Sequence, residues 1–363
     1  MKMHALFLFT LGFLLSAAFF FSWRESREGL SAGAAEEAEM VAKAAAGSQN
    51  NYVDTAKPDA VFDEALRSMS SHLDGLSGYL SPREKTLFEE LPRLGAPPFT
   101  LVRRYGFPVI AHLSPNYRGD LQEGDILKRI GDRSTYNRPL LTVKLMLMTL
   151  PSEELSLTLI RGEEGDPVRL SLKTDGSPFS LERRGAVSIL TPLFLRSSED
   201  QRSLDKALED LKTPYLLVDL RHLFFCHPLQ AIPFLQSLLP REVTLKLRGP
   251  KGERLLRLSP KMKRIPKVAA LVDSTTGEEA ELLAAALKEA GAPLYGETTR
   301  GECGLFSSLG FSDGSLLLVL SECPPQVQGK GVTPSPALSL ERVLKNPEPF
   351  FHEKIQKLPP KKK

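Results

Sequence analysis

The sequence predicts a mixed fold in which a small helical unit and a β-rich domain precede an α/β core. Two observations carry this expectation. Short apolar runs such as 215–221 and 268–272 alternate with helical patterns such as 229–239 in the second half of the chain. By contrast, residues 99–172 hold short β-like runs with one helix among them, at 140–150. The 363 residues suffice for roughly two or three domains.

The composition is that of an ordinary globular protein, with 42% hydrophobic and 25% charged residues. A formal net charge of +3 is too small to indicate nucleic acid as a partner. Cys226, Cys303 and Cys323 are too few for a disulfide framework. An exported protein could still pair two of them, and the sequence does not say which.

The N-terminus carries an apolar run between Lys2 and Arg24. It is about 19 residues long, close to the roughly 20 of a spanning helix and longer than the roughly 7–15 of a secretory h-region. We therefore expect residues 1–24 to be a signal-anchor rather than a cleaved signal peptide. The protein is then exported to an extracytoplasmic, periplasm-like or lumenal compartment and anchored in the membrane. Residues 25–57, rich in Ala, Gly and Glu, are interpreted as a linker, and 346–363 as a basic tail.

Residues 58–95 form the predicted helical unit. Asp59 is a candidate N-cap before an apolar stripe at helical spacing. The sequence Ser-Pro-Arg-Glu at 81–84 is a capping box with Pro at the first helical position, so a second helix begins there. This unit by itself indicates no chemistry.

Residues 96–175 resemble a PDZ domain. The segment 121–127, Leu-Gln-Glu-Gly-Asp-Ile-Leu, matches the Leu-x-x-Gly-Asp-x-Ile hallmark of that family. The resemblance implies that a protein or peptide C-terminus binds as an added strand beside the helix. The loop that would hold the terminal carboxylate contains Pro97 and Pro98, which lack N–H groups, so a packing module with a weak groove stays an alternative. The expected groove residues are Phe99, Leu101, Val143 and Leu147.

Residues 267–304 have the order of parts with which many α/β enzymes present a nucleophile. An apolar strand is followed by a polar turn at 273–279, a helix at 280–290, a second strand and a Gly-rich turn. The N–H groups at such a helix start lack partners within the helix and can stabilise an oxyanion.

Motifs throughout the chain resemble those of the carboxyl-terminal-processing, or tail-specific, serine peptidases. They are Leu-Asp-x-x-Ser-x-Tyr-Leu-Ser-Pro at 73–82, Asp-Leu-Arg at 219–221, Gly-Glu-x-Thr at 296–299, Asp-Gly-Ser at 313–315 and Gly-Val-Thr-Pro at 331–334. The resemblance implies a ClpP/crotonase-like α/β core in residues 176–345. It further implies that the PDZ domain captures a substrate's C-terminal tail and that a Ser–Lys dyad cleaves it.

The chain departs from this family at the residues that do the chemistry. Glu281 matches the family's Glu, and the nucleophile position three residues earlier holds Glu278. The position of the general-base Lys holds Glu302, which cannot take over the role of a Lys with a lowered pKa. In place of the Asn-x-Pro-Gly-Gly that helps form the oxyanion hole, residues 222–226 are bulky and lack Gly.

The sequence therefore predicts an inactive pseudo-peptidase that binds peptide tails or a partner protein, an active peptidase relative being one such partner. No cofactor and no metal are expected. The alternative is an active C-terminal-processing endopeptidase with a substitute nucleophile, for which the candidates are Ser274, Thr275, Thr276 and Cys303.

Two other interpretations concern ionisable clusters. Glu278 and Glu302 facing each other, with Glu281 nearby, could raise one pKa or bind a divalent cation, although solvated glutamates in an open cleft are the simpler reading. The cluster of His222, Cys226 and His227 lacks a standard zinc spacing and is interpreted as a chance grouping.

Overall fold

A computed structural model describes most of the chain between residues 58 and 351, together with a few residues between 36 and 47. The gaps are 75, 91–96, 116, 150–154, 163–167, 173–176 and 335–339. The predicted signal-anchor lies outside the described residues, as do most of the predicted linker and the end of the tail. Within the described part, no helix is long and apolar enough to cross a membrane. The chain divides into two compact units, Met1–Leu66 and Arg67–Lys363, and the sheets, the cores and the site described below lie in the second.

The predicted helical unit contains two helices and, unexpectedly, a strand. The helices are α3 (Pro58–Leu73) and α4 (Pro82–Glu90). The capping box is confirmed, since the N–H of Ser81 donates to Glu84 Oε2 at 3.0 Å and the N–H of Glu84 donates to Ser81 Oγ at 3.4 Å. Between the helices, β1 (Gly78–Leu80) pairs antiparallel with β18 (Leu316–Glu322). This segment thus completes a sheet with the C-terminal half, which the sequence did not indicate, and its assignment as a helical unit stays a prediction.

The β-rich part forms one antiparallel sheet. Its strands in spatial order are β2 (Phe99–Arg104), β3 (Phe107–Leu113), β4 (Ile126–Ile130), β6 (Leu155–Ile160) and β7 (Val168–Leu172), with β5 (Arg133–Ser134) beside β4. The helix is α5 (Leu140–Thr149). In the Gly-Asp pair before β4, Gly124 has φ +94° and the buried Asp125 binds Arg161 at 2.7 Å. Strands and helix lie where the sequence predicts them, while the assignment to the PDZ family stays a prediction.

The core is built on a five-stranded sheet. Its strands in spatial order are β16 (Leu294–Gly296), β15 (Lys267–Val272), β11 (Tyr215–Asp219), β9 (Val187–Pro192) and β8 (Phe179–Arg184). All are parallel except β8, which runs antiparallel at the edge. The central strands read as continuous apolar runs because parallel strands are covered on both faces.

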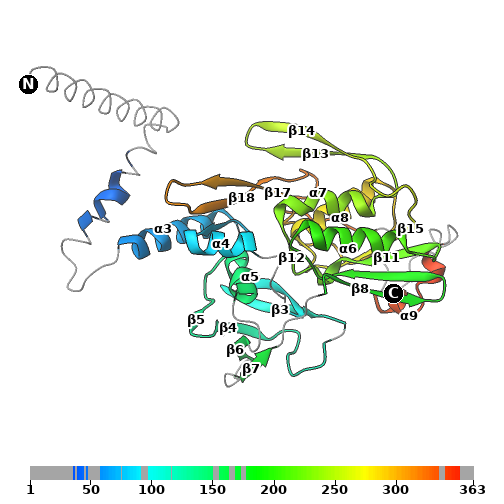
Figure 1. Cartoon of the computed structure of the whole chain (residues 1–363), viewed down its shortest axis with the longest axis horizontal. Helices are drawn as coiled ribbons and strands as arrows, with labels where there is room; N and C mark the ends of the chain where they lie inside the picture. The colour runs from blue at the N-terminus through cyan, green and yellow to red at the C-terminus, as the bar shows by residue number, and fades with distance from the viewer. Residues whose placement is uncertain are drawn as a thin grey trace, which may run out of the picture. The chain divides into compact units, whose positions relative to one another are not determined.

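Alternate residues of these strands pack into two cores. Leu216 and Val218 of β11 face one core, and Leu217 between them faces the other. The helices of the first core, which lie side by side in Figure 1, are α6 (Ser198–Glu209), α7 (Pro228–Leu238) and α8 (Glu278–Glu289). The elements of the second core are α9 (Leu340–Lys345) and η3 (Glu348–Phe351).

The basic tail predicted from residue 346 begins later than expected. Phe350 and Phe351 of η3 are buried, and the ring of Phe351 stacks on Tyr215 with the centroids 4.7 Å apart. The hydroxyl of Tyr295 donates to the carbonyl of Phe350. The core therefore extends to Phe351, because burial of two aromatic side chains favours packing over solvation of the segment.

Several short elements complete the second unit. The remaining strand pairs are β10 (Phe194–Leu195) with β12 (Phe225–Cys226), the predicted hairpin β13 (Val243–Gly249) with β14 (Gly252–Leu258), and β17 (Leu305–Gly310) with β18. The sequence did not indicate β17. One turn of 3₁₀ helix, η2 (Leu220–His222), follows β11 and leads into the bulky segment 222–226.

Candidate functional site

The site lies where β15 ends and α8 begins, with the strand, turn and helix that the sequence predicts. Asp273 holds the turn together. Its Oδ1 accepts hydrogen bonds from the N–H and the hydroxyl of Thr275 at 2.9 and 2.7 Å. Its N–H donates to the hydroxyl of Thr276 at 3.0 Å. The two threonine hydroxyls, which were candidate nucleophiles, therefore serve as turn contacts.

Glu281 connects α8 with the second turn of the site, at 299–302. Its side chain is fully buried, with 0% exposure. One carboxylate oxygen accepts from the N–H of Gly301 at 2.6 Å and the other from the N–H of Glu302 at 2.7 Å. The hydroxyl of Thr299 also donates to it. Burial raises the pKa of Glu281, while these hydrogen bonds act in the opposite direction. Glu281 therefore positions the turn that carries Glu302.

Glu278 is the first residue of α8 and has an unusual backbone. Its φ is +55°, a left-handed conformation that few non-glycine residues adopt. Its N–H donates to the carbonyl of Glu302 at 2.7 Å. The two family dyad positions are thus joined through their backbones, and the N–H at the start of α8 already has a partner.

The side chain of Glu278 is held by two cations. Lys144 Nζ of α5 lies 2.6 Å from Oε2, and Arg300 Nη2 lies 3.4 Å from Oε1. Arg300 Nε also lies 2.8 Å from Oε2 of Glu302. Burial alone raises the pKa of Glu278, but Lys144 and Arg300 together lower it below its usual value.

Arg300 thus pairs with both carboxylates of the expected Glu278–Glu302 pair. Contact between the two carboxylates, the less simple of the two interpretations, would raise one pKa, whereas Lys144 and Arg300 lower the pKa of Glu278. Within the described ranges, no group of three or more His, Cys, Asp or Glu side chains could hold a metal ion. His227, one of the three residues interpreted as a chance grouping, caps α7. Its Nδ1 accepts a hydrogen bond from the N–H of Leu229 at 3.2 Å.

Glu279 is a further ionisable residue of the site, which the sequence analysis did not single out. It is 3% exposed and lines a small pocket of about 20 Å³ with Leu141, Phe225 and Cys226. Burial, with a contribution from the negative charge of Glu278, raises the pKa of Glu279 to about 8. Its carboxyl is therefore protonated at neutral pH. In the sequence, only the apolar run 224–226 hints that an apolar pocket surrounds Glu279.

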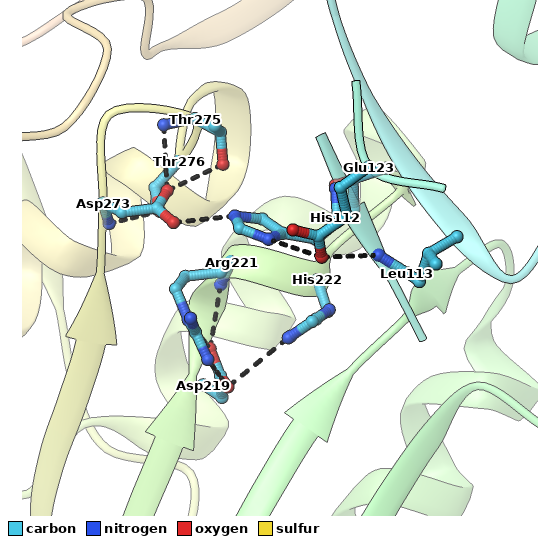
Figure 2. A network of polar contacts seen from close by, with 10 residues as sticks. His112, Leu113, Glu123, Asp219, Arg221, His222, Asp273, Thr275 and Thr276 are labelled. Carbon is cyan, nitrogen blue, oxygen red and sulfur yellow. Dashed lines mark hydrogen bonds and ion pairs between the residues drawn. The ribbon is translucent and has the colours of Figure 1, made fainter. Parts of the chain in front are cut away.

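A second polar contact links the β-rich part to the turn (Figure 2). His112 Nε2 of β3 lies 2.7 Å from Oδ2 of Asp273, and its Nδ1 lies 3.3 Å from Oε1 of Glu123. Burial lowers the pKa of His112, but Asp273 more than compensates, so the pKa is raised. Burial raises the pKa of Asp273, but the hydrogen bonds from His112 and Thr275 bring it below its usual value. Both ring nitrogens thus face carboxylates, which favours the imidazolium form.

His222 and Arg221 of η2 belong to the same network in Figure 2. The ring of His222 lies 5.3 Å from that of His112, and burial lowers its pKa. Arg221 binds Asp219, the first residue of the Asp-Leu-Arg motif, at 2.7 Å. The motif therefore supports the segment that contacts the β-rich part.

The four residues predicted to line a PDZ groove are buried in one apolar cluster with Phe224, from the segment after η2. They are Phe99, Leu101, Val143 and Leu147. The ring of Phe224 packs edge-on against Phe99 at 6.3 Å, and Lys144 Nζ lies 5.7 Å from the ring centroid of Phe224. The cavity left beside Lys144, Phe224 and Glu278 has a volume of about 20 Å³.

Comparison with known proteins gives a result only at the level of structure. No family model matches the sequence, and no curated protein sequence matches it. The photosystem II D1 C-terminal processing protease has a TM-score of 0.59 at 16% identity, over 83% of this chain and 87% of that one.

Two further solved structures have lower TM-scores. A putative S41 protease from Bacteroides fragilis has a TM-score of 0.42 at 16% identity, over 80% of this chain and 85% of that one. A CPAF mutant has a TM-score of 0.40 at 12% identity, over 93% of each chain. The similarity to the D1 processing protease carries the conclusion that this chain has the fold of the C-terminal-processing, or tail-specific, peptidases.

Proposed function

We propose that this protein is a tail-specific-peptidase-like pseudoenzyme that binds protein or peptide C-terminal tails without cleaving them. One observation carries the proposal. The residue at the nucleophile position, Glu278, is ion-paired with Lys144 at 2.6 Å and with Arg300 at 3.4 Å. A carboxylate fixed between two cations has no proton to give up to a base, and its contact with Lys144 closes the site against substrate.

The missing oxyanion hole supports the same conclusion. In acyl transfer, backbone N–H groups must point at the oxygen that becomes negative in the transition state. Here the N–H of Glu278 donates to the carbonyl of Glu302 at 2.7 Å, and the N–H of Phe224 donates to that of Leu193 at 2.7 Å. The N–H groups of Glu278 and Phe224 are therefore already hydrogen-bonded to carbonyl groups of the protein and do not point at a substrate oxygen.

The alternative, a substitute nucleophile, finds little support. The hydroxyl of Thr275 is bonded to Asp273, and His112 has both nitrogens against carboxylates, so it is not a free base. The thiol of Cys303 is buried, and its contact with Cys323 together with burial raises its pKa. Ser274 is exposed, and exposure alone does not activate a hydroxyl.

The binding role rests on the β-rich part. A tail that adds as a strand beside β2 would have to displace Phe224, so binding is coupled to separation of β2 and α5 from the segment after η2. We further propose that the protein is exported and anchored through residues 1–24, because that segment is apolar over about the length of a spanning helix. An active peptidase relative is a fitting partner for such a protein.

A peptide library with free C-terminal carboxylates tests the proposal. Binding is measured by fluorescence polarisation, and cleavage is followed in the same wells by mass spectrometry. We expect binding that is lost when the C-terminus is amidated, with no cleavage product. Turnover that disappears in Ser274→Ala or Cys303→Ala would establish the active peptidase instead. Equal binding of free and amidated tails would remove the tail-binding role.

A further inference from the structure

Two of the three cysteines lie against each other directly beside the site. The sulfur atoms of Cys303 and Cys323 are 2.9 Å apart, closer than two unbonded sulfur atoms pack. Both side chains are buried, and both are free thiols in this structure. Cys303 follows Glu302 in the turn before β17, and Cys323 follows the last residue of β18.

The backbone brings these two residues together for reasons that do not involve sulfur. Leu305 of β17 pairs with Glu322 of β18, so the residues just beyond this pair are cross-strand neighbours. Gly304 has φ +156°, and a Cβ at this position would clash with the carbonyl oxygen of Glu322. Glycine therefore allows the chain at 303–304 to approach β18 closely.

Cys323 is also fixed from its other side. Its N–H donates to the carbonyl of Arg248 at 3.1 Å, and its carbonyl accepts from the N–H of Arg248 at 2.9 Å. The third cysteine, Cys226, is in a different place, buried in β12 with its sulfur 3.7 Å from the carbonyl of His227. Of the three pairs that the sequence allows, the fold favours one.

We propose that Cys303 and Cys323 form a disulfide bond that ties the turn carrying Glu302 to the end of β18. The oxidant is another disulfide, either a small one such as oxidised glutathione or that of a thiol oxidoreductase. The Cys323 thiolate attacks this disulfide, which forms a mixed disulfide and releases one thiol. The Cys303 sulfur, after losing its proton, attacks the Cys323 sulfur and releases the second thiol. Two protein thiols and one disulfide thus become one protein disulfide and two thiols.

The contact between the sulfurs suits this order of events. The hydrogen bond from Cys303 lowers the pKa of Cys323, whereas the same contact and burial raise the pKa of Cys303. Because both sulfurs are buried in the folded protein, the exchange takes place as the chain folds or opens locally. Once formed and buried, the bond is shielded from reducing agents.

The bond would hold the same turn that Glu281 binds. The N–H groups of Gly301 and Glu302 bind the Glu281 carboxylate, and the disulfide would hold the next residue to β18. It would also restrict the unfolded chain, since the cysteines are 20 residues apart in sequence.

The direct test is a thiol map of the full-length protein. The purified protein is equilibrated with oxidised glutathione, denatured, treated with N-ethylmaleimide, digested without reduction and analysed by mass spectrometry. We expect a cross-linked peptide pair containing Cys303 and Cys323, with Cys226 alkylated. Alkylation of all three cysteines, or a cross-link that contains Cys226, would overturn the proposal. This measurement needs no variant to fold.

Single variants add an independent readout. Dithiothreitol should lower the melting temperature of the oxidised wild type and of the control Cys226→Ser by roughly 5 °C. It should leave Cys303→Ser and Cys323→Ser unchanged. An equal response of all four proteins to the reductant would contradict the assignment.

Discussion

Neighbouring glutamates in the first turn of α8 differ in ionisation, one carboxyl being charged and the next neutral. On one side, Lys144 and Arg300 surround Glu278 and lower its pKa. On the other, Glu279 lines an apolar pocket beside Phe225 and Cys226, and its pKa is raised to about 8. Two adjacent glutamates thus differ in ionisation because distant segments place cations beside one carboxyl and apolar side chains beside the other.

Glu281, one turn further along, shows a third environment, in which a buried carboxylate is bound by backbone N–H groups. A pair of carboxyl groups with separated pKa values can indicate acid–base chemistry. Here the ionised residue, Glu278, is paired with Lys144 and Arg300. We therefore explain the difference between the pKa values of Glu278 and Glu279 by the contacts that hold the site closed. The following variants test this explanation, from the largest expected effect to the smallest.

Glu281→Ala should have the largest effect. It leaves the buried N–H groups of Gly301 and Glu302 without acceptors, at about 1–3 kcal/mol each, so we expect a loss of about 4 kcal/mol in the free energy of unfolding. Urea denaturation measures it. Glu289→Ala, on an exposed position of the same helix, should change stability by less than about 0.5 kcal/mol. Similar losses in both variants would show that Glu281 does not hold the turn.

Glu279→Gln should alter the pH dependence of stability. The pKa of Glu279 is raised from 4.5 to about 8 in the folded protein. Its contribution to the free energy of unfolding is therefore fully present below pH 4.5 and is lost as pH rises through 8. Between pH 5 and pH 8 this loss amounts to about 3 kcal/mol for one group. The variant, which cannot ionise, should be flatter across that range and more stable at pH 8. Parallel wild-type and variant curves would refute a neutral Glu279.

Lys144→Met should destabilise the protein by about 2 kcal/mol, because it removes one of two cations from a half-buried carboxylate. Glu278→Gln in the same background should recover most of the loss. The matched control is Lys246→Met, which removes an exposed ion pair with Glu253 at 2.6 Å and should change stability by less than about 1 kcal/mol. Equal effects of the two lysine variants would mean that the Lys144 contact does not close the site.

His112→Gln should have the smallest effect, about 1 kcal/mol, and only at low pH. The pKa of His112 is raised, so its stabilising contact with Asp273 is fully present below pH 6.5 and is lost as pH rises through the folded-state pKa. Because the pKa of Asp273 is lowered, its contribution to stability is fully present above pH 3.8 and is lost as pH falls through the folded-state pKa. Thermal melts at pH 5 and pH 9 measure the difference. The control is His72→Gln, which replaces an exposed histidine of α3.

Much of the fold was accessible from local patterns. The capping box at Ser81 and Glu84, the apolar run of β15 and the polar turn before α8 are all present as predicted. Motif spacing also brought the two dyad positions together, since the N–H of Glu278 binds the carbonyl of Glu302. The strand β1 and the helix η3 were misjudged because their partners, β18 and β11 with β16, lie far away in sequence.

By itself, the sequence indicated the peptidase-like fold and, through its family resemblance, drew attention to Glu278 and Glu302. Tertiary structure alone decided what those carboxylates do. Lys144 lies 134 residues from Glu278, and His112 lies 161 residues from Asp273, so no local pattern could reveal either contact. The charge of a buried carboxyl depends on desolvation and on the ions around it, and both are set only when distant segments pack. The turn before α8 was recognisable as a site, and its closure by α5, β3 and Phe224 became apparent only in the folded chain.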